Sequence, residues 1–427
     1  MKRWNVLVFP CGSEIGLEIH RSLKYSTHIN LFGASSTDDH GKFVYDKYVG
    51  QLPFIGDDRI IDALKNIVGQ FGIDAIYPAM DSVICKLKNN ERQLGCKIIC
   101  SNVETTEICL SKRKTYELLS GKVKVPKVFA SLREIENYPV FVKPDIGFGS
   151  KGTFIAHSVN DLKFFARKFN IHEYVILEYL PFAEYTVDCF SNYKGNLLFV
   201  GPRHRNRIWN GISVNTKMEK NDYGLFYEIA TVLNKTLSFN GAWFFQMKRD
   251  INNQLTLMEI ASRLGGSSSL FRAKGINFAL LSVFDSFNVD VEIVMNGYDI
   301  ELDRALDNKY MLPLEFSTVY VDYDDCLIIN DKLNKELICF LFQAFTNGKK
   351  LILISKHVGD LKMALKKHRL DSLFDEVIQL RQEDEKHEFI HDKNAIFIDD
   401  SFSERKMIAS RLNIPVFSTD MVECLIR

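Results

Sequence analysis

Short apolar runs alternate with segments of helical periodicity at both ends of this chain, and this alternation limits the folds open to it. Near the N-terminus, the apolar run at residues 5–9 precedes a glycine-containing turn and then apolar residues at helical spacing. Near the C-terminus we predict strands at residues 318–321, 351–354, 395–398 and 415–417, with helices between them. Strands that alternate with helices form parallel sheets. We therefore predict a small doubly wound α/β domain in residues 1–104 and a Rossmann-like α/β domain in residues 317–427.

The middle of the chain, residues 105–312, has a different pattern in which short strands outnumber helices. The predicted strands are at residues 140–143, 153–157, 174–179, 185–191, 197–200 and 256–260. This pattern indicates an α+β domain with antiparallel sheets. A proline-bearing segment at residues 310–317 separates it from the last block. Several domains are expected because 427 residues exceed what one hydrophobic core usually absorbs.

The charge balance and the cysteines exclude some classes of partner and compartment. Lysine and arginine together number 54, as do aspartate and glutamate, so the formal net charge is zero. Such a chain does not attract nucleic acid or an anionic membrane over long range, and we expect neither as a partner. The first apolar run is too short for a signal peptide, and no run reaches the length of a membrane helix. The nine scattered cysteines contain no CxxC pair, which favours reduced thiols in the cytoplasm. The sequence gives no indication of oligomeric state.

A glycine-rich loop between two predicted strands is the most informative short motif. Lys143 ends the first strand, and the loop contains Gly147, Gly149, Ser150 and Gly152. Because a strand and not a helix follows the last glycine, the GxGxxG spacing does not indicate a dinucleotide site. The backbone of such a loop can instead fold over phosphates, which Lys143 would neutralise. A flexible surface hairpin is the alternative interpretation.

Further motifs lie on both sides of this loop: LSKRK at residues 110–114, ILEYLP at 176–181, AEYTVD at 183–188 and LMEIASRLGG at 257–266. With the loop, they resemble the ATP-grasp superfamily, in particular its carbamoyl-phosphate-synthase-like carboxylate–amine ligases. The resemblance covers roughly residues 1–312. It implies an ATP-grasp fold preceded by a small pre-ATP-grasp domain, with ATP and Mg²⁺ as cofactors.

The resemblance also assigns the nucleotide contacts. It implies that Lys112, Lys143 and the glycine loop bind the phosphates of ATP. Glu178 and the backbone N–H of Leu180 would face the adenine ring. Glu184 matches the position that holds the ribose hydroxyls.

The metal and catalytic residues follow from the same resemblance. Gln246 and Glu259 match the Mg²⁺ ligands, and Arg263 the arginine that stabilises the oxyanion. Ala261 stands where the superfamily usually has an asparagine ligand, so a degenerate nucleotide-binding or sensing module remains an alternative to an active ligase. Three closely spaced arginines form either an anion-binding face or a solvated loop: Arg203, Arg205 and Arg207.

Acidic residues follow two of the predicted C-terminal strands, where ligands of open α/β sheets bind. Asp322 and Asp324 come after the first of these strands, Ser355 after the next, Lys386 later, and Asp399 after another. This order resembles the haloacid-dehalogenase-like phosphatases. It implies that Asp322 is the nucleophile, Asp324 the general acid/base, and Ser355 and Lys386 the phosphate ligands. Mg²⁺ would be held by Asp322, Asp324 and Asp399, and the short gaps between motifs leave no room for a large cap domain.

Together the patterns predict an ATP-dependent carboxylate–amine ligase fused to a Mg²⁺-dependent phosphatase. The expected partners are a small carboxylic acid, an amine and a phosphorylated metabolite. In one alternative only the phosphatase is active and the first 312 residues bind or sense a nucleotide. A non-enzymatic scaffold is a further alternative. It does not explain why lysine, glutamate, arginine and aspartate residues occur along the chain in the order that both kinds of active site require.

Overall fold

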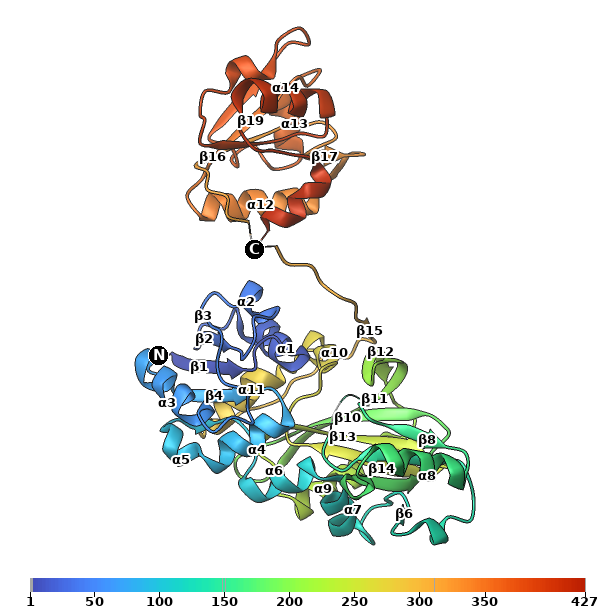
Figure 1. Ribbon diagram of the computed structural model, residues 1–427. Coiled ribbons are helices and arrows are strands. Elements are labelled where there is room, and N and C mark those ends of the chain that lie inside the picture. Colours follow the sequence, from blue (N-terminus) through green and yellow to red (C-terminus); the bar gives the residue numbers. More distant parts are fainter. Residues whose placement is uncertain (1–2, 148, 150, 311, 427) are drawn as a thin grey trace. The chain divides into compact units, whose positions relative to one another are not determined.

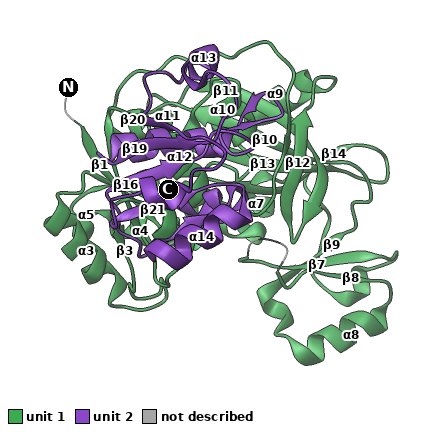
Figure 2. Ribbon diagram, turned by 90° about the horizontal axis from the view of Figure 1, so that it is seen from above, with its two compact units in different colours: residues 1–307 green, residues 308–427 purple. Residues whose placement is uncertain are grey.

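The computed structural model describes residues 3–147, 149, 151–310 and 312–426. The chain divides into two compact units, residues 1–307 and residues 308–427 (Figure 2). Each unit has its own sheets and hydrophobic core. We describe each unit by itself.

The N-terminal part of the first unit is a five-stranded parallel sheet with the order β3-β2-β1-β4-β5 (Figure 1). Its strands are β1 (Trp4–Phe9), β2 (Ile29–Ala34), β3 (Tyr48–Val49), β4 (Ala75–Pro78) and β5 (Lys97–Ile98). The helices are α1 (Glu14–Leu23), α2 (Gly41–Val44), α3 (Ile60–Phe71), α4 (Asp81–Asn89) and α5 (Glu91–Leu94). The sheet is covered on both faces, because Val6 and Val8 pack in one core cluster and Leu7 and Phe9 in another.

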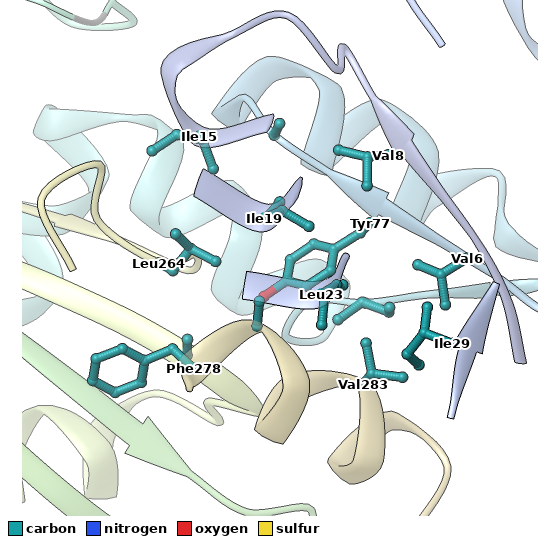
Figure 3. Close-up of a cluster of buried hydrophobic side chains, with 14 of the residues drawn as sticks. Val6, Val8, Ile15, Ile19, Leu23, Ile29, Tyr77, Leu264, Phe278 and Val283 are labelled. Atoms are coloured by element: carbon teal, nitrogen blue, oxygen red, sulfur yellow. The ribbon is translucent and has the colours of Figure 1, made fainter. Parts of the chain in front are cut away.

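One of these core clusters joins the N-terminal sheet to the middle of the chain. Figure 3 shows Ile15, Ile19 and Leu23 of α1 next to Phe278 and Val283, which belong to α11 (Phe278–Ser286). All of these side chains are at least nine-tenths buried. Burial of such apolar surface stabilises the contact between α1 and α11. The first residues of α1 are therefore held in place against the middle region, which matters for the site described below.

The middle region contains two antiparallel sheets. The larger has the order β14-β13-β10-β11-β12-β15 and the smaller β6-β9-β7-β8 (Figure 1). The larger sheet consists of β10 (Glu184–Ser191), β11 (Leu197–Trp209), β12 (Ile212–Met218), β13 (Gly241–Arg249), β14 (Leu255–Ala261) and β15 (Glu301–Asp303). The smaller consists of β6 (Val128–Phe129), β7 (Val140–Pro144), β8 (Phe154–Ala156) and β9 (Tyr174–Glu178). The helices are α6 (Val103–Leu110), α7 (Lys112–Leu119), α8 (Val159–Lys168), α9 (Tyr223–Thr236), α10 (Ser269–Ala273) and α11.

The predicted antiparallel α+β character of this region is confirmed, but the extent of its sheets was underestimated. Strand β11 continues to Trp209, well past the predicted end at residue 200, and β12 was not predicted. The second half of β11 is a run of charged and polar residues that lacks apolar alternation, whereas β12 alternates apolar and polar residues and its signal was overlooked. Cross-strand pairing in a long hairpin, with the turn Asn210-Gly211 at its tip, gives these residues extended structure.

The second unit contains a five-stranded parallel sheet with the order β20-β19-β16-β21-β22. Its strands are β16 (Thr318–Val321), β19 (Lys350–Ser355), β20 (Glu376–Gln379), β21 (Ala395–Ile398) and β22 (Val416–Phe417), and its helices α12 (Lys335–Thr346), α13 (Leu361–Lys367) and α14 (Phe402–Leu412). The predicted parallel sheet is confirmed, whereas the edge strand β20 was missed. Between β16 and α12 lies only a small hairpin of β17 (Ile328–Ile329) and β18 (Lys332–Leu333).

Two expectations about the whole chain can be compared with the structure. None of the helices in the described ranges is long and apolar enough to cross a membrane. All nine cysteines carry free thiols.

Candidate active sites

A row of polar side chains crosses the large sheet of the first unit. In the strand register, Arg203 of β11 lies opposite Thr186 of β10, Thr186 opposite Gln246 of β13, and Gln246 opposite Glu259 of β14. Directly opposite residues of antiparallel strands place their side chains on the same face. All four residues line one cavity of about 270 Å³. We call this cavity the sheet pocket.

The N-terminal part of the unit forms another wall of the sheet pocket. Ser13 and Glu14, at the start of α1, and Asp81, at the start of α4, line it together with Gly149 of the glycine loop. Both helices begin after the carboxyl end of a parallel strand, which is where such sheets usually place their ligands. The packing of α1 against α11 fixes this wall relative to the sheet.

A bidentate ion pair with Asp81 holds Arg263 in the sheet pocket. Its Nε and Nη2 each donate to a carboxylate oxygen of Asp81 over 2.9 Å, and its Nη1 donates to the carbonyl oxygen of Leu264. Burial lowers the pKa of Arg263, but the Asp81 carboxylate outweighs this and holds the pKa above its ordinary value. Arg263 is therefore a fixed cation that lines the same pocket as Glu259.

Two buried lysines lie near the same acidic residue. Lys143 donates to the carbonyl oxygen of Met258 over 2.9 Å, and Lys112 donates to the carbonyl oxygen of Gly147 over the same distance. Burial lowers the pKa of Lys143 to about 8, against the opposing effect of the Glu259 and Glu184 carboxylates. Burial also lowers the pKa of Lys112. Burying two ammonium groups is costly unless an anion compensates them, so this arrangement suits a polyanionic ligand.

A smaller, mostly apolar cavity of about 120 Å³ adjoins Lys143. Its apolar lining comes from Tyr116, Pro126, Phe141, Ile155, Leu177, Leu180 and Met258. Lys143, Glu178, Tyr179 and Lys248 add polar groups. One carboxylate oxygen of Glu178 accepts a hydrogen bond from the backbone N–H of Lys127. A narrow apolar slot with a few polar groups suits a flat heteroaromatic ring.

The remaining predicted nucleotide contacts differ in their surroundings. Glu184 forms an ion pair with Arg205 at 2.7 Å and lies 3.6 Å from the Nζ of Lys248. Gly149 and Gly152 have positive φ angles of 61° and 73°, which a glycine adopts without strain. Ser150 lies outside the described residues.

The three closely spaced arginines do not share one environment. Arg203 and Arg205 line the sheet pocket, whereas Arg207 is exposed and pairs with Asp303. The pairing of β11 with β12 shifts its register between Arg205 and Arg207, and this irregularity removes Arg207 from the common face.

The oxygen donors fit a divalent cation at the edge of the sheet pocket. The Gln246 amide and the Glu259 carboxylate are cross-strand neighbours on one face. Ala261 adds no oxygen, and its cross-strand neighbour is Phe244. Mg²⁺ accepts few protein ligands when water and phosphate oxygens complete its shell, so these two side chains suffice for one such ion.

The second unit brings four of its predicted site residues together. Asp322, Ser355 and Asp399 lie at the carboxyl ends of three adjacent strands, and Lys386 lies in the 3₁₀ helix Lys386–Phe389. Lys386 donates to Asp322 over 2.8 Å and to Asp399 over 2.6 Å, and Ser355 donates a hydrogen bond to Asp322. Burial raises the pKa of Asp399 to about 6 and also raises that of Asp322, while Lys386 opposes both shifts. Carboxylate oxygens of Asp322, Asp399 and Asp400 lie within 4.8 Å of one another, which fits a divalent cation.

Asp324 lies at the exposed side of this cluster. Its carboxylate is half-exposed and contacts the Nδ1 of His357 at 2.9 Å. The ring of His357 in turn packs edge-on against Tyr323. Asp324 is thus held outside the Lys386 network, within reach of solvent.

Sequence analysis missed several residues of these sites. Asp81 and Glu14 were not singled out, although each opens a helix after a parallel strand, and that position was the available signal. The pairs Arg263–Asp81, Arg304–Glu14 and His357–Asp324 join residues far apart in the sequence. No local spacing indicates such pairs.

Comparison with known proteins identifies the fold of the first unit. Residues 170–301 match a family model described as ATP-grasp in the biosynthetic pathway with Ter operon. D-alanine–D-alanine ligase of Petrotoga mobilis is 27% identical over 143 residues, which are 31% of this chain and 45% of that protein. The match thus spans less than half the length of that curated relative.

Solved structures of similar fold cover about two thirds of the chain. The biotin carboxylase domain of Hydrogenobacter thermophilus 2-oxoglutarate carboxylase, a complex with MgADP, aligns with a TM-score of 0.58 at 12% identity, covering 69% of this chain and 72% of that one. N5-carboxyaminoimidazole synthetase from Staphylococcus aureus has a TM-score of 0.57 at 18% identity, with coverages of 68% and 79%. L-amino acid ligase from Bacillus licheniformis has a TM-score of 0.55 at 18% identity, with coverages of 67% and 75%. The first unit therefore has the ATP-grasp fold.

Proposed function

We propose that the ATP-grasp unit of this chain is an ATP-dependent carboxylate–amine ligase that acts through an acyl phosphate. The observation that carries this proposal is the sheet pocket, which the metal-type donors Gln246 and Glu259 line together with the fixed cation Arg263. The adjoining apolar slot and the two buried lysines supply the features that a nucleotide with its phosphates requires. The relatives named above, including a solved complex with MgADP, support ATP and Mg²⁺ as the cofactors.

In this proposal each group of residues has one task. The apolar slot positions the adenine ring beside Glu178 and Leu180, and Lys143 and Lys112 neutralise the phosphates. Mg²⁺, held by Glu259 and Gln246, would supply charge neutralisation during phosphoryl transfer. Arg263 stabilises the negative charge that develops on the carboxylate under attack. The γ-phosphoryl group leaves ADP for the acid, and the amine then displaces phosphate from the acyl phosphate.

Hydroxylamine provides a test that does not require knowledge of the amine. It attacks an acyl phosphate at carbon, releases phosphate and leaves a hydroxamate that forms a coloured iron complex. We expect the full chain with Mg·ATP and a pool of carboxylic acids to form hydroxamate and ADP in equal amounts. ADP release without hydroxamate would reject the acyl-phosphate route.

The lowered pKa of Lys143 predicts how ATP binding depends on pH. Below about pH 8 the Lys143 ammonium is present and attracts the triphosphate, whereas above it the amine is neutral in the free protein. ATP must then recruit a proton, so its affinity should fall by up to about tenfold per pH unit above pH 8. Calorimetric titration with Mg·ATP between pH 7 and pH 9.5 measures this fall.

Lys143→Arg is the matched control for this pH dependence, because a guanidinium keeps its proton across the whole range. Its affinity for ATP should change little between pH 7 and pH 9.5, whatever its absolute value. An equally flat profile for the unaltered chain would show that Lys143 does not face the triphosphate.

For the second unit we propose a Mg²⁺-dependent phosphatase of the haloacid-dehalogenase-like type. The cluster of Asp322, Ser355, Lys386 and Asp399 supports it. The buried Lys386 ammonium bridges the carboxylates of Asp322 and Asp399, so the proposed nucleophile Asp322 lies next to a cation that can also bind a phosphate. The strand order of the unit and its small hairpin in place of a cap agree with this resemblance. Asp322 would take up the phosphoryl group and Asp324 would protonate the leaving alcohol.

The alternative of a nucleotide-sensing first unit rests on Ala261, which provides no metal ligand. The hydroxamate assay separates the two possibilities. A sensing unit binds Mg·ATP but forms no hydroxamate with any acid.

A further inference from the structure

The two aspartates that follow β16 have opposite surroundings. The side chain of the proposed nucleophile Asp322 is 9% exposed and accepts a hydrogen bond from Lys386, whereas that of the proposed general acid Asp324 is 51% exposed. In phosphoryl transfer the attacking and leaving oxygens lie roughly in line on opposite sides of the phosphorus. Because Asp322 is on the buried side, the leaving alcohol departs toward the open side of the site. Asp324 lies on that side, where it can give a proton to the leaving oxygen.

An exposed aspartate side chain samples several rotamers unless a neighbour holds it. The neighbour of Asp324 is His357, whose Nδ1 lies 3.0 Å from Oδ1 and 2.9 Å from Oδ2 of the carboxylate. Among the residues that the structure describes, no other side chain or backbone group forms a hydrogen bond with this carboxylate. The contact with His357 therefore selects one orientation of the proposed general acid.

His357 is itself held in place by the elements around it. It lies in the loop after β19, and Gln379 of β20 donates through Nε2 to the carbonyl oxygens of His357, over 3.0 Å, and of Gly359, over 2.6 Å. The ring of Tyr323, which is buried, packs edge-on against the imidazole with ring centres 5.0 Å apart. The imidazole is thus a fixed support for the exposed side chain of Asp324.

We propose that His357 is a positioning residue of the phosphatase site, which holds the Asp324 carboxyl group where that group passes its proton to the leaving oxygen. The inference rests on the phosphatase function proposed above. In the first step the Asp322 carboxylate forms a bond to phosphorus, the bond from phosphorus to the leaving oxygen breaks, and the proton of Asp324 moves to that oxygen. A well-oriented acid contributes most when the leaving oxygen is strongly basic. His357 should therefore matter more for alkyl and phenyl esters than for p-nitrophenyl phosphate.

Esters with different leaving groups test this role in the full chain with Mg²⁺. His357→Phe keeps an aromatic ring beside Tyr323 and removes Nδ1. It should lower kcat for phenyl phosphate and glycerol 3-phosphate by about tenfold or more, and kcat for p-nitrophenyl phosphate by less than about threefold. His357→Asn provides an amide N–H in place of Nδ1 and should restore most of the loss. His391→Ala, at an exposed position of the same unit, is the matched control and should leave every rate unchanged.

A double-mutant cycle shows whether His357 acts through Asp324. Asp324→Asn removes the proton donor, so adding His357→Phe to it should cause no further loss with phenyl phosphate. Losses that multiply, or an equal loss for all three esters, would overturn the proposal, because His357 would then act on something other than proton transfer. A faster rate in His357→Phe would also overturn it, since the contact would then keep Asp324 away from the leaving oxygen.

The outcomes distinguish this inference from the function on which it rests. Unchanged rates in His357→Phe, with phosphate still released by the unaltered chain, would reject the role of His357 and leave the phosphatase intact. If the unaltered chain releases phosphate from none of the three esters, the phosphatase function itself fails, and the inference fails with it.

Discussion

Asp322→Asn should lower phosphate release from p-nitrophenyl phosphate by about three orders of magnitude or more, because an amide cannot form the aspartyl phosphate. The fold should tolerate this change. Lys386 contacts both Asp322 and Asp399, so the substitution leaves a buried lysine paired with one carboxylate and no isolated charge. Phosphate release from the full chain with Mg²⁺ measures the effect.

Two comparisons make this result specific. Asp371→Asn, at an exposed position of the second unit, should release phosphate at the unaltered rate. Hydroxamate formation by the first unit should continue in Asp322→Asn, since each unit contains its own set of site residues. Equal phosphate release by Asp322→Asn and the unaltered chain would show that Asp322 is not a nucleophile.

The parallel sheets were predictable because their strands are buried on both faces and read as continuous apolar runs. Strand β1 is the clearest case, with Val6, Leu7, Val8 and Phe9 all buried. Strand β12 alternates apolar and polar residues from Ile212 and was predictable, whereas β11 was not predictable beyond residue 200. Its charged residues form ion pairs with residues of neighbouring strands, as Arg205 does with Glu184. An analysis of hydrophobic periodicity does not detect such pairs. Strand β20 was missed because a short edge strand with polar ends has little apolar signal.

The site could be predicted where its chemistry lies within short motifs. Glu259 and Arg263 belong to one such motif, and Asp322 and Asp324 to another, so their residue types and spacing were visible in the sequence. The groups that hold these residues in place were not visible. Asp81 reaches Arg263 only because the packing of the N-terminal sheet against the middle region brings them together. The same holds for His357, whose contact with Asp324 depends on two adjacent strands, β16 and β19.

Replacing Arg263 by alanine should lower hydroxamate formation by about 100-fold or more, while the affinity for Mg·ATP changes by no more than a few-fold. The reason is that the Arg263 guanidinium is assigned to charge that develops during phosphoryl transfer and not to bound ATP, and the loss of one such donor typically has an effect of this size. Steady-state hydroxamate formation and calorimetric titration with Mg·ATP measure the two quantities.

The ion pair with Asp81 complicates the interpretation, because Arg263→Ala also leaves the Asp81 carboxylate unpaired beside the pocket. The double variant Asp81→Asn with Arg263→Ala removes that charge. If Arg263 acts on the reacting groups, the double variant stays as slow as Arg263→Ala. Recovery of turnover in the double variant would mean that Arg263 serves only to neutralise Asp81. Arg207→Ala, which breaks an exposed pair with Asp303 outside the sheet pocket, controls for the general effect of losing an arginine–carboxylate contact and should leave both measurements nearly unchanged.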